Sequence, residues 1–268
     1  MEKQHNLADI VFSRKLFIIY LATYFVPFIT SWIAFVYLKV IQFSDTIRGL
    51  SSPIGIGGIL GVLVFVFTWW FTQKKRFVKF DPEDPASVKR INKLAKSFQN
   101  ITLATAILNS AICALIVQSS FHLQGIEVDK LPLYTTCIGN VILISATFYI
   151  RFLQTVEESL YTVPFRKEFK SLSLIMRSVL VSGFTSIGSL MITITPVFVT
   201  NLSNLPIGVL FWRYVFPEGI LGATFIVICS FLQMRGQSRR VKLITDFTQE
   251  VAANDYTGEA LLVESRDE

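Results

Sequence analysis

LFIIYLATYFVPFITSWIAFVYL, from Leu16 to Leu38, is an apolar stretch without Asp, Glu, Lys, Arg or His. As a helix it is roughly 35 Å long at 1.5 Å per residue, and a bilayer core of about 30 Å needs about 20 apolar residues. Arg14 and Lys15 precede it, but the run is too long for a signal-peptide core and no A-x-A-like cleavage site follows. We therefore predict an uncleaved first transmembrane span.

Five more stretches of this kind follow, and the composition of the whole chain agrees with them. Of its 268 residues, 52% are hydrophobic and only 16% are charged, with a mean hydropathy of +0.53; soluble domains are about 25% charged. We predict an all-α fold, a polytopic membrane protein with six transmembrane helices and cytoplasmic helical extensions. The predicted spans are residues 16–38, 53–72, 101–120, 133–150, 178–200 and 216–234.

The lysines and arginines predict how these spans face the membrane. Of the 25 in the chain, 21 lie in the N-terminal tail, the second and fourth connections and the C-terminal tail, and the remaining four lie in the other three connections. The positive-inside rule then places both termini in the cytoplasm. Because the positive charges lie between apolar runs, they indicate orientation and not nucleic-acid binding.

The same boundaries predict three parts of the chain. These are a cytoplasmic N-terminal tail (1–15), a six-helix transmembrane sensor or anchor domain (16–234) and a C-terminal segment (235–268). In the second connection, Asp84-Pro85 has the form of a helix start, and Val88, Ile91 and Phe98 then recur on one helical face. This cytoplasmic helix is expected to continue into the third span, and Pro164 is expected to open a similar one before the fifth.

The spans contain almost no ionisable groups, which limits the chemistry they can perform. Glu218, at an outer edge, is the one exception, and this argues against a proton-coupled pump, a voltage sensor or an intramembrane protease. The uncharged polar residues of the spans have two interpretations. Together with Glu218 they could form a small-molecule pocket in the outer half of the bundle, or they could form hydrogen bonds between helices. The candidates for ligand binding are Asn109, Gln118, His122, Asn140, Thr193 and Glu218.

No sequence motif indicates an enzyme, a cofactor or a metal site. P-loop, dinucleotide-binding, zinc-protease and nucleophile-elbow patterns are missing. Cys113, Cys137 and Cys229 all lie in apolar runs, and we interpret them as small buried hydrophobic residues. Gly57-x-x-x-Gly61 permits close helix contact, either within the bundle or across a dimer.

The C-terminal segment has the pattern of a coiled-coil helix followed by a break. Val241, Ile244, Thr248 and Val251 form an a/d seam on a helix that continues the sixth span. The break falls at Asn254-Asp255, a connector with apolar residues follows, and Asp267-Glu268 resembles a second helix start. A helix with such a seam needs a partner helix.

In this arrangement the segment resembles a HAMP domain, the parallel four-helix relay of bacterial receptors. The matching residues are the four seam positions, the AAND of 252–255 and the acidic pair at 267–268; Arg240 and Asn254 stand where the family often has Pro and Gly. The resemblance covers about 30 residues, including the first helix, the connector and the start of the second helix. It implies a homodimer through the HAMP helix and, since the second helix is cut short, a fragment.

Six spans followed by HAMP are similar to the input halves of class III adenylate or guanylate cyclases and of methyl-accepting chemoreceptors. The resemblance implies a signal-transduction receptor in a bacterial inner membrane. It would relay the state of the membrane, or the signal of a lipid-like or small apolar ligand, to a cytoplasmic output domain. Two other functions stay open, a transporter or permease subunit and a passive dimerising anchor. The lipid bilayer is the partner common to all three.

Overall fold

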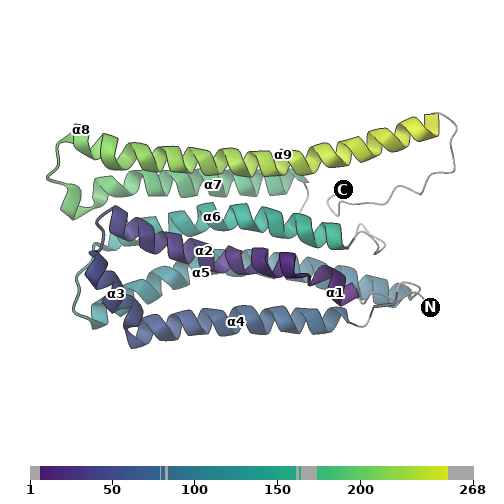
Figure 1. Ribbon diagram of the computed structural model, residues 1–268, viewed down its shortest axis with the longest axis horizontal. Helices are drawn as coiled ribbons and strands as arrows, with labels where there is room; N and C mark the ends of the chain where they lie inside the picture. The colour runs from purple at the N-terminus through teal and green to yellow at the C-terminus, as the bar shows by residue number, and fades with distance from the viewer. Residues whose placement is uncertain (1–6, 79, 82–83, 161–162, 164–173, 253–268) are drawn as a thin grey trace.

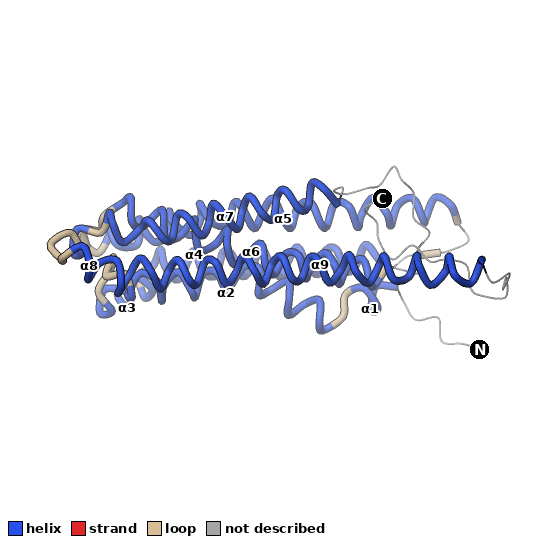
Figure 2. The backbone as a smooth tube through the Cα atoms, turned by 90° about the horizontal axis from the view of Figure 1, so that it is seen from above, coloured by secondary structure: helices blue, strands red, loops and turns tan. Residues whose placement is uncertain are grey.

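The computed structural model contains six helices that are long and apolar enough to cross a membrane, so the chain is an all-α polytopic membrane protein. It describes residues 7–78, 80–81, 84–160, 163 and 174–252. The long helices run side by side along one axis, and the described residues contain no strand (Figures 1 and 2). The helical elements are α1 (Leu7–Val11), α2 (Arg14–Tyr37), α3 (Phe43–Ser51), α4 (Pro53–Phe77), α5 (Pro85–Leu123), α6 (Lys130–Ser159), α7 (Leu174–Phe198), a 3-10 turn (Thr200–Leu202), α8 (Ile207–Leu210), a π-helix labelled η3 (Phe211–Val215) and α9 (Phe216–Ala252).

The sequence places all six spans correctly, and the differences lie at their ends. The predicted third span lies inside α5, which starts at Pro85 and has 39 residues, so the predicted helical extension before that span is confirmed. The sixth candidate span starts at Ile207 and not at Phe216, because α8 and the π-helix run directly into α9. The helix predicted to start at Pro164 lies outside the described residues.

Helix starts follow the local sequence. The Asp84 carboxylate accepts hydrogen bonds from the backbone N–H groups of Ala86 and Ser87, at 2.9 and 3.0 Å, and Pro85 occupies the first turn, where its missing N–H is not needed. In the same way Ser52 caps α4, with Pro53 following it. The connection before α4 contains one helix that was not predicted, α3, with Phe43 and Ile47 exposed.

Helix α6 lies at the centre of the bundle. In the most apolar 18-residue segment of α6, 72% of the residues are buried inside the protein. The corresponding share is 17% for α4 and also 17% for the sixth span. Helix α9 packs against α6, α7 and the π-helix, whereas α4 packs against α1, α3 and α5. Figure 1 accordingly shows α4 and α9 on opposite edges of the bundle.

The core has two halves. At the end where α4 finishes and α5 begins, which we name the basic end because Lys74, Lys75 and Arg76 lie there, aromatic rings fill the interior. Phe12 lies edge-on to Trp70 with ring centroids 4.9 Å apart, and Phe98 packs against Phe152 at 5.1 Å. The other half, at the opposite end, includes Trp32, Phe35, Phe121, Val199 and Tyr214.

Candidate functional site

A buried carboxylic acid lies at the start of α9. Glu218 is 5% exposed, and its Oε2 atom has no hydrogen-bond partner among the described residues. An ionisable group inside a membrane span is costly and is by default a candidate functional group. Glu218 is therefore the strongest single candidate of the residues selected from the sequence.

The π-helix just before Glu218 is held by the end of α2. Pro217 has no N–H, so in a regular α-helix the carbonyl of Arg213, four residues earlier, has no donor. The Tyr37 hydroxyl donates to this carbonyl at 2.5 Å, and the rings of Tyr37 and Tyr214 pack with centroids 5.7 Å apart. Such rescue of a proline-freed carbonyl by a neighbouring helix is typical of membrane proteins.

Two of the candidate residues bind the backbone of α2. The Asn140 amide of α6 donates to Thr30 Oγ1 at 2.9 Å, Ser31 Oγ at 3.1 Å and the carbonyl of Pro27 at 3.4 Å. The Asn109 amide of α5 donates to the carbonyl of Tyr24 at 3.4 Å. These contacts agree with the interpretation of both residues as hydrogen-bonding groups between helices.

The remaining candidates lie at other helix contacts. The Tyr134 hydroxyl of α6 donates to Gln118 Oε1 of α5. Thr193 donates within α7 to the carbonyl of Ser189 at 2.8 Å, and its methyl carbon lies 3.8 Å from an ideal Cβ built on Gly219, next to Glu218. His122 is exposed at the end of α5. Of the six candidates, Thr193 lies nearest to Glu218 among the described contacts, since it faces the neighbouring Gly219 across the contact of α7 with α9.

A small cavity lies between α2, α4 and α5, next to Asn109. Its volume is about 20 Å³, and Phe28, Val62 and Cys113 are among the residues that line it. A space of roughly 10–15 Å³ is enough for one water molecule, whereas ligand pockets measure about 300–1,000 Å³. In the described arrangement this cavity holds no more than a water-sized group.

Glycines lie at close contacts between several helices, including α6 with α7 and α7 with α9, but Gly57 and Gly61 are not among them. A Cβ added to Gly188 of α7 lies 2.7 Å from the carbonyl oxygen of Gly139 in α6, and a Cβ added to Gly222 of α9 clashes with Ser189 Oγ of α7. Nothing lies within 4 Å of a Cβ on Gly57 or Gly61 of α4. A contact of these two glycines across a dimer stays a prediction.

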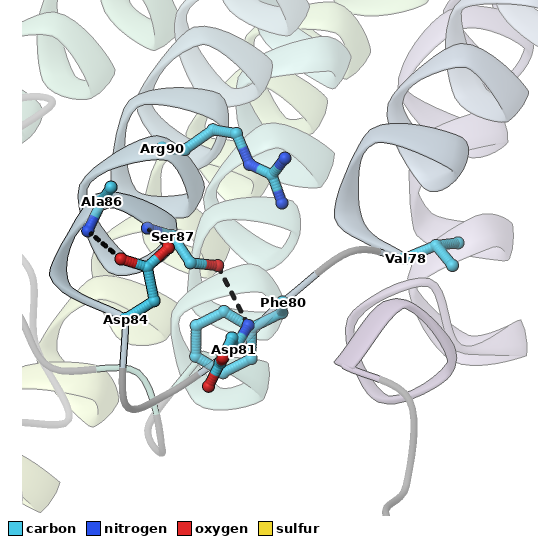
Figure 3. A pocket seen from close by; sticks show the side chains of 7 residues that line it. All are labelled: Val78, Phe80, Asp81, Asp84, Ala86, Ser87 and Arg90. Atoms are coloured by element: carbon cyan, nitrogen blue, oxygen red, sulfur yellow. Dashed lines mark hydrogen bonds between the residues drawn. The ribbon is translucent and has the colours of Figure 1, made fainter.

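A pocket of about 430 Å³ lies at the basic end, in the connection between α4 and α5. Figure 3 shows the Asp84 cap on one side, the Ser87 hydroxyl accepting from the Asp81 N–H at 2.9 Å, and Arg90 extending toward the side of Val78. Residues 79, 82 and 83 of the same connection lie outside the described part of the chain. The hydrogen bonds described in this pocket cap the start of α5 and join the Asp81 N–H to Ser87.

The predicted seam lies on an uninterrupted helix. Helix α9 has 37 residues and continues past the bundle at the basic end (Figures 1 and 2). The backbone at Val241, Ile244, Thr248 and Val251 is helical, as predicted, and this part of the helix is described up to Ala252. The predicted connector and second helix start, in residues 253–268, lie outside the described residues.

The fold and this site define the class of protein, a polytopic α-helical membrane protein. No protein-family model, no curated protein and no solved structure matches the chain. The resemblance to HAMP domains therefore depends on the sequence pattern of the C-terminal segment alone.

Sequence reasoning missed Tyr37 and the π-helix as parts of the site. One signal was available, because Pro217 interrupts an apolar run directly before Glu218. A proline inside a membrane helix leaves the carbonyl four residues earlier without its α-helical donor, and a neighbouring helix, a side chain or a local π adjustment can then satisfy that carbonyl. That the donor is Tyr37, 176 residues away along the chain, follows only from the tertiary structure.

Proposed function

We propose that this chain is the membrane input module of a signal receptor, in which α9 carries a change in helix packing from the opposite end of the bundle to the basic end. The supporting observation is the length and continuity of α9. Its 37 residues make a helix of roughly 55 Å, against a bilayer core of about 30 Å. Roughly 25 Å of one rigid element therefore extends beyond the core, with the predicted seam on it.

In this proposal the basic end faces the cytoplasm, as the distribution of lysine and arginine favours, and the membrane is a bacterial inner membrane. Two copies associate through Val241, Ile244, Thr248 and Val251 in a parallel dimer. The signal is the state of the membrane itself or a lipid-like or small apolar ligand. The HAMP resemblance supports an effector of the nucleotide-cyclase or chemoreceptor kind.

The arrangement of the bundle limits which surfaces one dimer can use. Helices α4 and α9 lie on opposite edges (Figure 1), and a twofold interface uses the same patch on both copies. A dimer through α9 therefore leaves Gly57 and Gly61 facing lipid. If these glycines also associate, they form a second, separate interface.

Disulfide crosslinking in native membranes tests the seam. In a variant with Cys113, Cys137 and Cys229 replaced by Ser or Ala, we expect single cysteines at Ile244 and Thr248 to give crosslinked dimers. Position 246 is about 160–200° around a regular helix from positions 244 and 248, so Asp246→Cys is the matched control and is expected to crosslink several-fold less. Absence of seam dimers, or equal yields at all three positions, contradicts the proposal.

The same crosslinks separate a receptor from the two alternative functions. In vesicles with shorter or longer acyl chains, a sensing bundle changes its packing, so the ratio of the Ile244 and Thr248 crosslinks is expected to change. A passive anchor keeps this ratio constant. A transporter or permease subunit is instead identified by solute flux into the same vesicles.

A further inference from the structure

Glu218 is a buried carboxyl of the sixth span without a neutralising partner among the described residues. The residue is 5% exposed, and its Oε2 atom has no hydrogen-bond partner in the part of the chain that the structure describes. The ion pairs among the described residues join Lys15 to Glu158 and Lys74 to Asp9, both at the basic end. No positive charge in the described residues therefore forms an ion pair with Glu218.

The titratable groups at this end of the bundle come from α2, the π-helix and α6. Tyr37 at the end of α2 lies within electrostatic range of Glu218 and of Arg213 and Tyr214 in the π-helix. Arg213 is exposed, with its guanidinium carbon 5.9 Å from the centre of the Tyr214 ring. Helix α7 presents the uncharged Thr193, and at this end of α6 Lys130 is exposed and Tyr134 is bonded to Gln118.

An unpaired carboxylate in such surroundings is unfavourable, because its lost hydration is not replaced by a cation or by donors. Binding a proton removes the charge and leaves the side chain where it is. Losing the proton favours a position nearer the headgroups and water. Glu218 is in the first turn of α9, so this movement acts directly on the helix.

The π-helix gives α9 a way to move. A π-turn is one residue wider than an α-turn, and its conversion to α-helix changes the register of the rest of α9 by one residue, about 100° of rotation and about 1.5 Å of translation. The bond from Tyr37 to the Arg213 carbonyl holds the turn in its present form. Movement of Glu218 and release of this turn are thus linked within a few residues.

We infer that Glu218 is a proton-binding site that sets the rotation of α9. In the described arrangement the carboxyl is protonated, buried and next to an intact π-turn. Deprotonation moves the carboxylate toward the membrane surface and relaxes the turn, which rotates α9 as one rigid helix. The proton site stands independently of the proposed function, whereas its effect on the seam rests on it.

Infrared difference spectroscopy on the full chain in vesicles tests the proton site directly. We expect a C=O stretch of a protonated carboxylic acid that disappears as pH rises, is lost in Glu218→Gln and persists in Glu127→Gln, an exposed acid at the same end. Glu218→Asp keeps a carboxylic acid and should shift the band without removing it. An unchanged spectrum in Glu218→Gln overturns the inference.

Crosslinking then tests the rotation. At high pH we expect the Ile244→Cys dimer yield to fall at least threefold relative to Glu218→Gln measured at the same pH, so that the pH dependence of thiol chemistry cancels. If the yield of seam dimers does not change with pH although the infrared band of Glu218 does, the proposed rotation of α9 is wrong. If no seam dimers form at any pH although the infrared band of Glu218 is present, the proposed function is wrong and the proton site is still supported.

Discussion

The hydroxyl of Ser145 in α6 donates a hydrogen bond of 3.0 Å to the carbonyl of Thr23 in α2. Pro27 lies four residues after Thr23 inside α2 and has no N–H for this carbonyl. The Tyr37 bond to Arg213, four residues before Pro217, has the same form. At two of the prolines within its long helices, therefore, the protein supplies a hydroxyl from another helix to the carbonyl that the proline leaves free.

Replacing Ser145 by Ala should destabilise the bundle through this single bond. Side-chain hydrogen bonds between membrane helices contribute on average about 0.6 and at most about 1.7 kcal/mol, and we expect a loss in this range in the free energy of unfolding in bicelles. Thr224→Ala is the control, because the exposed Thr224 hydroxyl bonds only the Ile220 carbonyl of its own helix. An equal loss in both variants contradicts the assignment.

Glycine substitutions should distinguish the packed from the open faces. Gly188→Ala places a methyl group 2.7 Å from the Gly139 carbonyl oxygen, so α6 and α7 must move apart; overpacking of this kind costs about 1–3 kcal/mol. Gly57→Ala and Gly61→Ala meet nothing within 4 Å and should leave unfolding unchanged. If either lowers the dimer fraction measured by crosslinking, the exposed face of α4 is an interface.

Labelling from one side of the membrane tests the proposed orientation. Glu127, between α5 and α6, and Thr245, in α9, are both exposed and lie toward opposite ends of the bundle. With cysteines at these positions, a membrane-impermeant maleimide should label Glu127→Cys on intact cells and Thr245→Cys only after permeabilisation. The reverse pattern means that the charge distribution does not set the orientation of this protein.

The parts of the fold that depend on local patterns were predictable from the sequence. Apolar length identifies the six spans, and Asp84-Pro85 identifies the start of α5. The parts that depend on contacts between distant residues were not. Asn140 was selected as a polar residue in an apolar span. Its partners Thr30 and Ser31 lie in α2, which is separated from α6 along the chain by α3, α4 and α5. An apolar run in the sequence predicts the length of a transmembrane helix, but it does not predict which other helices pack against it.

The same limit explains the site at the start of α9. Glu218 could be selected because it is a charge in an apolar run, whereas its burial depends on how α6, α7 and the π-helix pack against α9. Candidates such as Gln118 and Thr193 lie in the same half of the bundle by sequence, but they face different helices. Depth in the membrane is readable from the sequence, and the direction of a side chain around the helix axis is only partly so.

Tyr37→Phe should show whether the α2 hydroxyl stabilises the π-turn. The substitution removes the donor to the Arg213 carbonyl and keeps the ring that packs on Tyr214, so we expect a loss of about 0.6–1.7 kcal/mol in the free energy of unfolding. In a Pro217→Ala background the new N–H at position 217 replaces the Tyr37 donor, because it can bond the carbonyl four residues earlier. The Tyr37→Phe loss should then shrink to near zero, which is a coupling energy measurable by a double-mutant cycle. Equal losses with and without Pro217 would mean that the hydroxyl acts through some group other than the carbonyl that Pro217 leaves free.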